Sequence, residues 1–321
     1  MSVLACDVGG TRIKVGLVSD GQLLATQTLD AAIQEGLGRS LVRIGEALQV
    51  VCEQAGIEPS ACRGIGMGLA ALVDWRQCRV IDPHSKYTDA EAVDLNVWAR
   101  ETFGLPLAAD NDARAALLGE WTYGAGRGSD NLGVITLGTG IGTAVGIDGH
   151  VLRGPNFRTG NFCGHMIVAA DGRTCGVCGM RGCVEAETGS AQLPDVAQRM
   201  YGFAQSALSQ CDRIDYAAVC RCAAEVDPVA AALLGRATYL WSVLCVNMIH
   251  AFDLDRIVFG GGVMGSAEMI LPPIQEFVDR HVCAPAGASR VQIISAEQPD
   301  HMALLGCEAL VDEKLSFSHA V

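Results

Sequence analysis

Short apolar runs recur along the chain, and most of them end in glycine. The run VLACDV at residues 3–8 precedes a Gly-Gly turn, and RIKVGLV at 12–18 leads to Asp20-Gly21, a pair that favours a tight hairpin. From residue 133 the same order returns in GVITLGTGIGTAVGIDGHVL: a strand, a glycine turn, a second strand and an Asp-Gly pair. A repeated supersecondary unit predicts two related halves that face each other, although glycine-turn hairpins look alike in any protein.

Helical patterns alternate with further strands along the rest of the chain. Apolar residues at 41, 44, 48 and 51 repeat with the helical period and predict a helix over 38–55. The remaining pattern predicts, in order, a buried strand with a glycine-rich bend over 62–74, a helix over 89–103 closed by Gly104, a strand over 105–112 that leads into a helix over 113–121, helices from about 193 to 250, strands over 254–260 and 290–297, and a closing helix over 301–315.

The composition is that of a globular, acidic protein. Of 321 residues, 50% are hydrophobic, and the formal net charge of −13 argues against a broad electrostatic contact with nucleic acid. Many of the fourteen cysteines lie inside apolar runs, as expected of free thiols in the cytoplasm. No signal-peptide pattern is visible, and polar residues interrupt the long apolar stretch at 228–252, so we expect a core helix and no membrane partner.

Three glycine-rich turns each follow an apolar strand, which indicates a polyphosphate ligand. Glycine allows the backbone to approach a ligand closely, and consecutive amides in a turn bind anions. The turns have neither the P-loop spacing nor the full dinucleotide-binding pattern. The predicted phosphate-binding residues are Gly9, Gly10, Thr11, Gly138, Thr139, Gly140, Gly260, Gly261 and Gly262.

Two charged residues flank the first glycine turn. Asp7 precedes the turn, where a carboxylate can hold the water shell of Mg²⁺. Lys14 follows on the returning strand, from which an ammonium can reach a phosphate. The alternative for Lys14 is a solvated charge on a strand.

The stretch AADNDARAA places three polar residues where a predicted strand meets a helix. Asp112 is a candidate general base toward a hydroxyl, and the adjacent Asn111 can orient that hydroxyl. Phosphoryl transfer requires mainly positioning and charge neutralisation, so one carboxylate with Mg²⁺ and backbone amides is a sufficient set. The same residues suit a helix N-cap equally well.

The stretch GHMIVAADGRTCGVCGMRGC contains the ligands of a tetrahedral zinc site. His165, Cys175, Cys178 and Cys183 form a C-x₂-C-x₄-C pattern with an upstream histidine. A nucleic-acid finger and a redox-active thiol pair are the alternatives, but the acidic chain disfavours the first. The extra histidine and third cysteine disfavour the second.

Five motifs occur in the order found in the ROK family of sugar kinases, which the chain resembles over nearly its whole length: DVGGTRIKVGLV, NDARAALLGE, TLGTGIG, the His-Cys cluster with GCVEA, and IVFGGGV. The resemblance implies an α/β fold of two actin-like, ribonuclease-H-like domains that flank a cleft. A smaller domain would comprise 1–116 plus 305–321, and a larger domain, with the zinc-stapled loop, would comprise 117–304. A homodimer or homotetramer is the expected assembly.

The resemblance also implies roles for individual residues. ATP with Mg²⁺ would bind the glycine turns, with adenosine against Gly260–Gly262, and Asp112 would take the proton of the attacking sugar hydroxyl. Zinc would be structural and would fix the direction of the His165 ring. The implied sugar contacts are Asn111, His165, Glu185 and His84.

Several sugar-contact positions depart from the family pattern. The usual GEIGH reads NFCGH, so Asn161 or Phe162 replaces a glutamate, the usual PN reads Pro83-His84, and the usual PG reads Ala70-Ala71. The cysteine spacing is also one residue longer than usual. These changes predict an altered sugar preference and leave glucose in doubt. Alternatives are a sugar-binding regulator without turnover and a DNA-binding repressor, the latter disfavoured because the phosphate motif begins at Asp7.

Overall fold

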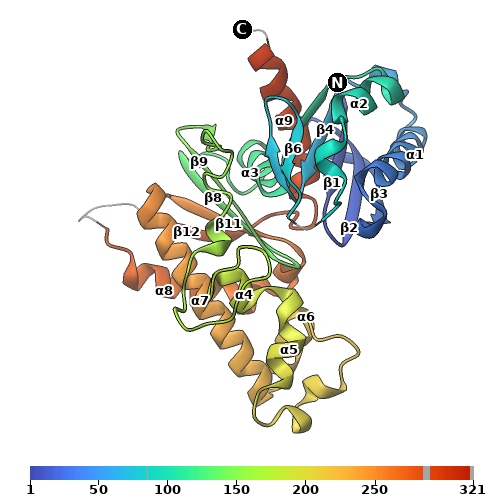
Figure 1. Ribbon diagram of the computed structural model, residues 1–321. Helices are drawn as coiled ribbons and strands as arrows, with labels where there is room; N and C mark the ends of the chain where they lie inside the picture. The colour runs from blue at the N-terminus through green and yellow to red at the C-terminus, as the bar shows by residue number, and fades with distance from the viewer. Residues whose placement is uncertain (85, 285–289, 319–321) are drawn as a thin grey trace. The chain divides into compact units, whose positions relative to one another are not determined.

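The computed structural model describes residues 1–84, 86–284 and 290–318 (Figure 1). Contacts along the chain group these residues into two compact units. Unit 1 contains residues 1–128, 151–161 and the chain from 301 onward, and unit 2 contains 129–150 and 162–300. The chain therefore leaves unit 1, returns to it for one short segment and returns again for its last helix.

Each unit contains a five-stranded sheet with the same strand order. In unit 1, β1 pairs antiparallel with β2 and parallel with β4, and in unit 2, β8 pairs antiparallel with β9 and parallel with β11. The repeat predicted from the sequence is thus present in both sheets. The order in unit 1 is β3 (Gln22–Asp30), β2 (Arg12–Ser19), β1 (Val3–Val8), β4 (Ile65–Leu69) and β7 (Leu107–Asn111). The order in unit 2 is β10 (His150–Val151), β9 (Ile141–Ile147), β8 (Asn131–Leu137), β11 (Arg256–Gly260) and β12 (Gln292–Ser295).

Alternation along β1 divides the core of unit 1 between two helices. Leu4, Cys6 and Val8 belong to the apolar cluster that includes the buried face of α1 (Leu37–Ala55). Ala5 belongs to a second cluster with α9 (Met302–Ser318). Helix α9 also packs closely against α3 (Asp112–Thr122), and the unit is completed by α2 (Leu95–Phe103) and the hairpin of β5 (Leu72–Asp74) and β6 (Arg79–Asp82).

The helices of unit 2 confirm only part of the predicted helical stretch from 193 to 250. The prediction is wrong over residues 199–215, which form turns and two short 3-10 helices, because Gly202 is left-handed and Asp215 caps a new helix. The unit contains α4 (Val184–Thr188), α5 (Leu193–Gln198), α6 (Tyr216–Ala224), α7 (Pro228–Phe252) and α8 (Ala267–His281).

Helix α7 is long and apolar enough to cross a membrane by length and composition alone, which is weak evidence for a span. In the folded protein, 61% of its most apolar 18-residue window is buried. The helix packs against α6 and α8, and Trp241 on it is fully enclosed. These contacts agree with the core helix expected from the sequence.

A buried ion network joins three distant segments of unit 1. Asp110, at the end of β7, accepts a hydrogen bond from Arg114 Nη1 at 3.3 Å and one from Arg153 Nε at 2.7 Å. Arg153 belongs to the returning segment 151–161 and also forms a two-pronged ion pair with Glu313 of α9. Arg114 donates to the carbonyl of Phe157 at 2.7 Å. No sequence pattern predicts this network, which holds the returning segment and α9 against the β7–α3 junction.

Replacement of Arg153 by methionine removes one guanidinium from Asp110, a carboxylate with 0% exposure. Since loss of one partner leaves buried charge incompletely paired, we expect the free energy of unfolding to fall by about 3–5 kcal/mol. Urea unfolding followed by tryptophan fluorescence measures the change. Arg79→Met, on the exposed side of β6, is the control and should cost less than about 0.5 kcal/mol. Equal effects of the two substitutions would contradict the role of the network.

Candidate functional site

The parallel register of unit 1 gathers its polar residues at one edge of the sheet. Lys14 of β2 is the cross-strand partner of Asp7, and Gly68 of β4 pairs with Asp7 on one side and Asp110 on the other. A side chain at Gly68 would meet the Cα of Asp112 at 3.2 Å. The start of α3 therefore lies directly against the β4 backbone at Gly68, the cross-strand neighbour of Asp7.

Asn111 is the N-cap of α3, which confirms the capping alternative for this residue. Its Oδ1 accepts hydrogen bonds from the backbone amides of Ala113 and Arg114, at 2.9 and 3.3 Å. Its Nδ2 donates to the carbonyl of Ala71 at 3.2 Å and to Asp112 Oδ1 at 2.9 Å. Asn111 thus orients the Asp112 carboxylate, which remains partly exposed.

Two carboxylates share the region beside the first glycine turn. Burial raises the pKa of Asp7 to about 7, and the charge of Asp112 adds to the rise while Lys14 opposes it. Burial also raises the pKa of Asp112, and Lys86 is the strongest opposing influence. A cation close to both carboxylates would keep them ionised at neutral pH.

Sequence reasoning gave His84 a role but missed Lys86 and Tyr87, which pack on the first glycine turn. The hydroxyl of Tyr87 donates to the carbonyl of Gly9 at 2.9 Å, and Lys86 Nζ donates to the carbonyl of Ala70 at 3.3 Å. A Cβ on Gly10 would meet Lys86 Cε at 3.0 Å, so the lysine stem lies against the Gly10 backbone. The rarity of lysine could have drawn attention to Lys86, because the chain contains only three lysines.

The residues at the altered family positions also have defined partners. His84, predicted to contact sugar, has a left-handed backbone, and its Nδ1 is 3.4 Å from Asp82 Oδ1. Asn161 donates from Nδ2 to Asn111 Oδ1 at 2.7 Å, whereas the ring of Phe162 packs on that of His165 with centroids 5.7 Å apart. Asn161 is therefore the altered residue that reaches the neighbourhood of Asp112.

In unit 2, the second glycine turn is in contact with Glu185. Glu185 Oε2 accepts from the amide of Ile141 at 2.9 Å, and a Cβ on Gly140 would meet the same oxygen at 2.3 Å. The carboxylate predicted to contact sugar thus lies at the base of the turn. Gly138 and Thr139 are exposed, so their backbone is accessible to a ligand.

The triple glycine follows β11, which is the parallel neighbour of β8, so the second and third glycine turns lie at the same edge of the sheet. Gly261 has a φ of 87°, and a Cβ there would clash with the carbonyl of Leu137 at 2.3 Å. Only glycine fits this position without a shift of the backbone. Close contact between the two turns therefore requires the glycine that the sequence provides.

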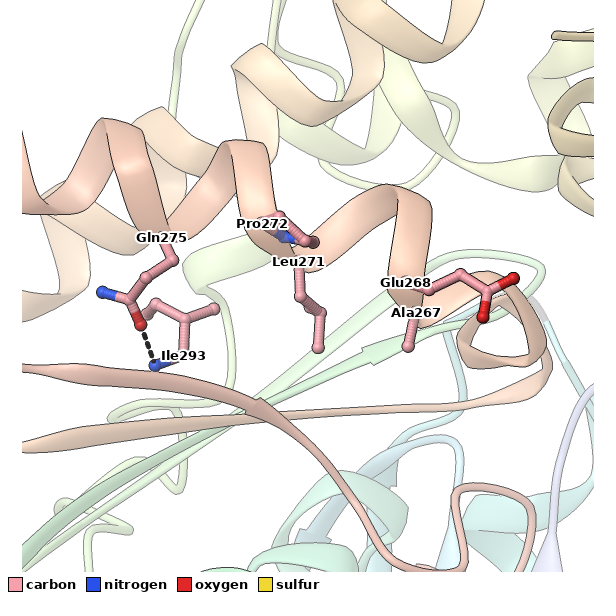
Figure 2. Close-up of a pocket in the computed structure, with 6 residues that line it drawn as sticks. All are labelled: Ala267, Glu268, Leu271, Pro272, Gln275 and Ile293. Carbon is pink, nitrogen blue, oxygen red and sulfur yellow. Dashed lines mark hydrogen bonds between the residues drawn. The ribbon is translucent and has the colours of Figure 1, made fainter. Parts of the chain in front are cut away.

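Two hollows in unit 2 contain none of the predicted catalytic or phosphate-binding residues. A shallow groove of about 350 Å³ runs between α8 and β12, where Gln275 Oε1 accepts from the amide of Ile293 (Figure 2). A second hollow of about 580 Å³ adjoins the loop before α4, where Arg236 pairs with the buried carboxylate of Glu187 at 2.5 Å. In this hollow each of Arg173 and Arg236 is paired with a carboxylate.

The four predicted zinc ligands come together in unit 2. The donor atoms of His165, Cys175, Cys178 and Cys183 all lie within 4.8 Å of one another. His165 Nδ1 is 3.8 Å from Cys175 Sγ and 3.7 Å from Cys183 Sγ, and the Sγ atoms of Cys178 and Cys183 are 4.0 Å apart. With metal–sulfur bonds of about 2.3 Å, a tetrahedral ion gives ligand separations of this size. The residues therefore fit a four-coordinate zinc ion.

The surrounding backbone supports thiolate ligands. The amides of Val177 and Ala186 point at Cys175 Sγ and Cys183 Sγ, each at 3.4 Å. Donors of this kind stabilise negative charge on sulfur. Cys183 is also the N-cap residue of α4, so the cluster is connected directly to the helix that carries Glu185.

Comparisons with known proteins assign the chain to a family. The ROK family model matches residues 3–314. Glucokinase of Thermotoga maritima is 27% identical over 321 residues, 98% of each chain, and N-acetylmannosamine kinase of Vibrio cholerae is 26% identical over 278 residues, 87% of this chain and 89% of its own.

Among solved structures, a ROK family glucokinase from Streptomyces griseus in complex with glucose and AMPPNP is similar with a TM-score of 0.84 and 27% identity, covering 98% of this chain and 100% of its own. A ROK family transcriptional regulator shares the fold at a TM-score of 0.79 and 24% identity, with 98% of this chain and 80% of its own covered. The prediction of a carbohydrate kinase is confirmed by the kinase relatives, and the chain belongs to the ROK family.

Proposed function

We propose that the protein transfers the γ-phosphoryl group of ATP to a hydroxyl of a hexose or hexose derivative, with Asp112 as general base. The observation that carries this proposal is the arrangement of Asp112, which is held by Asn111 at the start of α3, beside Asp7 and the first glycine turn. The bound glucose and AMPPNP of the similar Streptomyces griseus enzyme support the two substrate classes.

In the proposed reaction, Asp112 accepts the proton of the attacking hydroxyl as that oxygen bonds to the γ-phosphorus. The bond from the γ-phosphorus to the bridging oxygen of ADP breaks at the same time, and ADP retains the electron pair. Amides of the glycine turns and Lys14 neutralise phosphate charge. Asn111 fixes the rotamer of the base, because its Nδ2 binds the Asp112 Oδ1 oxygen.

Mg²⁺ would neutralise the β- and γ-phosphates, and Asp7 is the residue that would hold its water shell. The fit rests on charge: the Asp112 carboxylate raises the pKa of Asp7, and a divalent cation between them would offset that repulsion. The adenosine end of ATP is assigned to the triple glycine, whose backbone is accessible at Gly261 and Gly262.

Zinc has a structural role in this proposal. Coordination through Nδ1 would fix the ring of His165 and leave Nε2 to bind a sugar hydroxyl. The same cluster would fix the start of α4 through Cys183 and thereby place Glu185. Four protein ligands would close the coordination sphere, as is usual for structural rather than catalytic zinc.

A regulator without turnover is the second candidate, because a ROK transcriptional regulator shares this fold. The partly exposed and oriented carboxylate of Asp112 favours the kinase. A binding protein needs no base with a raised pKa beside a phosphate turn.

Asp112→Asn tests the base. The amide keeps the shape of the side chain but accepts no proton, so we expect kcat to fall by at least about 100-fold, with sugar and ATP affinities nearly unchanged. A coupled assay of ADP release and calorimetric binding measure both quantities. Asp130→Asn, at an exposed surface position of unit 2, is the matched control. A variant at position 112 that retains most of its kcat would refute the assignment.

A substrate screen tests the altered sugar preference. Because Asn161 and His84 occupy positions that differ from the family pattern, we expect kcat/KM for a hexose other than glucose to exceed that for glucose by at least about tenfold, or about 1.4 kcal/mol. The screen compares glucose, mannose, N-acetylmannosamine, N-acetylglucosamine and fructose under one set of conditions. A clear preference for glucose would show that the altered positions do not determine specificity.

Metal analysis tests the zinc cluster. We expect about one zinc per chain, and Cys178→Ser should lower both the zinc content and the sugar affinity because His165 loses its fixed orientation, with losses of about 10–100-fold. Cys211→Ser, a partly exposed cysteine outside the cluster, should change neither. Full sugar affinity in a zinc-free protein would contradict the bracing role.

A further inference from the structure

Lys86 is a cation that the mechanism above leaves unused although it lies against the catalytic region. Its stem packs on Gly10, where a Cβ would approach Cε to 3.0 Å and Cδ to 3.1 Å, and its charge acts on Asp112. The ammonium has three N–H donors, and the carbonyl of Ala70 accepts from it at 3.3 Å. The side chain is half-buried, so its charge is only partly screened by water.

The backbone that follows Lys86 is held by contacts of Tyr87 and Asp89. Tyr87, the next residue, is 6% exposed and binds the Gly9 carbonyl through its hydroxyl at 2.9 Å. Asp89 accepts hydrogen bonds from the amides of Leu37 and Gly38 at the start of α1. Residues 86–90 are therefore tied to the first glycine turn and to α1, so the lysine stem lies in a defined place.

The use of lysine is itself selective. Of the 23 lysines and arginines in the chain only three are lysines, at positions 14, 86 and 314, and two of these three lie beside the first glycine turn. A lysine presents a compact point charge on a flexible stem, whereas arginine presents a planar fork suited to carboxylates. A compact cation suits a site where a single phosphate oxygen must be met while the phosphorus moves.

We propose that Lys86 is a catalytic residue that donates an ammonium hydrogen bond to the γ-phosphoryl group during its transfer. This inference rests on the proposed function. Contact with the turn at Gly10 and electrostatic contact with Asp112 place the ammonium where a phosphoryl group would pass from the turn toward the hydroxyl that Asp112 deprotonates. Negative charge is spread over the three equatorial oxygens of that group, and a fixed cation stabilises it.

The step is balanced without any further reactant. The proton of the hydroxyl goes to Asp112, the new oxygen–phosphorus bond forms as the bond to ADP breaks, and ADP leaves with the electron pair. Lys86 stays protonated throughout and transfers no proton. Its contribution is therefore expected in the transition state more than in the binding of either substrate.

Lys86→Met tests the proposal because methionine keeps an unbranched stem but carries no charge. We expect kcat to fall by at least about 100-fold, with KM for ATP and for sugar changed by less than about threefold. Lys86→Arg should recover at least a tenth of the wild-type kcat. Lys314→Met removes a lysine whose Nζ binds the carbonyls of Trp75 and Arg76, and it serves as the control for loss of charge.

Binding of ADP with aluminium fluoride, which mimics the transferred phosphoryl group, provides a second readout. We expect Lys86→Met to weaken this complex by a factor similar to its loss of kcat, while the affinity for ADP alone stays unchanged. Melting temperatures of all variants identify any loss of folding, and the aluminium fluoride comparison uses only folded protein.

Three outcomes would overturn the inference. A kcat within about threefold of wild type would remove Lys86 from the reaction. A loss confined to the KM of the sugar would assign Lys86 to sugar recognition, and equal losses of ADP and ADP–aluminium fluoride affinity would assign it to uniform nucleotide binding. Absence of sugar phosphorylation by the wild-type protein would defeat the proposed function itself, so the two failures are distinguishable.

Discussion

The carboxylate of Asp110 is the charge around which unit 1 is assembled. It is fully enclosed, and a buried carboxylate is tolerated only when it is paired and hydrogen-bonded. Two arginines from different segments and the amide of Asn111 meet this requirement, the amide at 2.8 Å. The end of β7 is thereby fixed in place, and so is the first turn of α3, which follows it directly.

Three consecutive residues at this junction have different partners and different exposure. Asp110 anchors the ion network, Asn111 closes the first turn of α3, and Asp112 keeps a partly exposed carboxylate. The side chain of Asn111 is fully engaged. Its Oδ1 accepts from a helix amide and from Asn161, and its Nδ2 donates to Asp112. Asn111, predicted to contact sugar, thus has hydrogen bonds within the protein that define the local fold.

Features that depend on local pattern were predictable, and features that depend on distant segments were not. The strands, the glycine turns and the cluster of His165 with three cysteines follow from spacing within short stretches, and the structure contains them. Arg153 meets partners 43 and 160 residues away in sequence, so no periodicity or motif announces it. Lys86 was missed for the same reason, because it is held beside the glycine turn by the contact of Tyr87 with the distant Gly9. Residue roles, the bound ions and the assembly stay predictions.

The ion network around Asp110 has an electrostatic consequence for the neighbouring Asp112 carboxylate. Two guanidinium groups and two carboxylates, those of Asp110 and Glu313, make an assembly without net charge. Opposite charges in close contact produce a potential that falls off faster than that of a single ion. Arg114 and Arg153 therefore lie near Asp112 without imposing a strong positive potential on its carboxylate. The ionisation of Asp112 then depends on its burial, on the charge of Lys86 and on hydrogen bonds from Asn111 and Ala113.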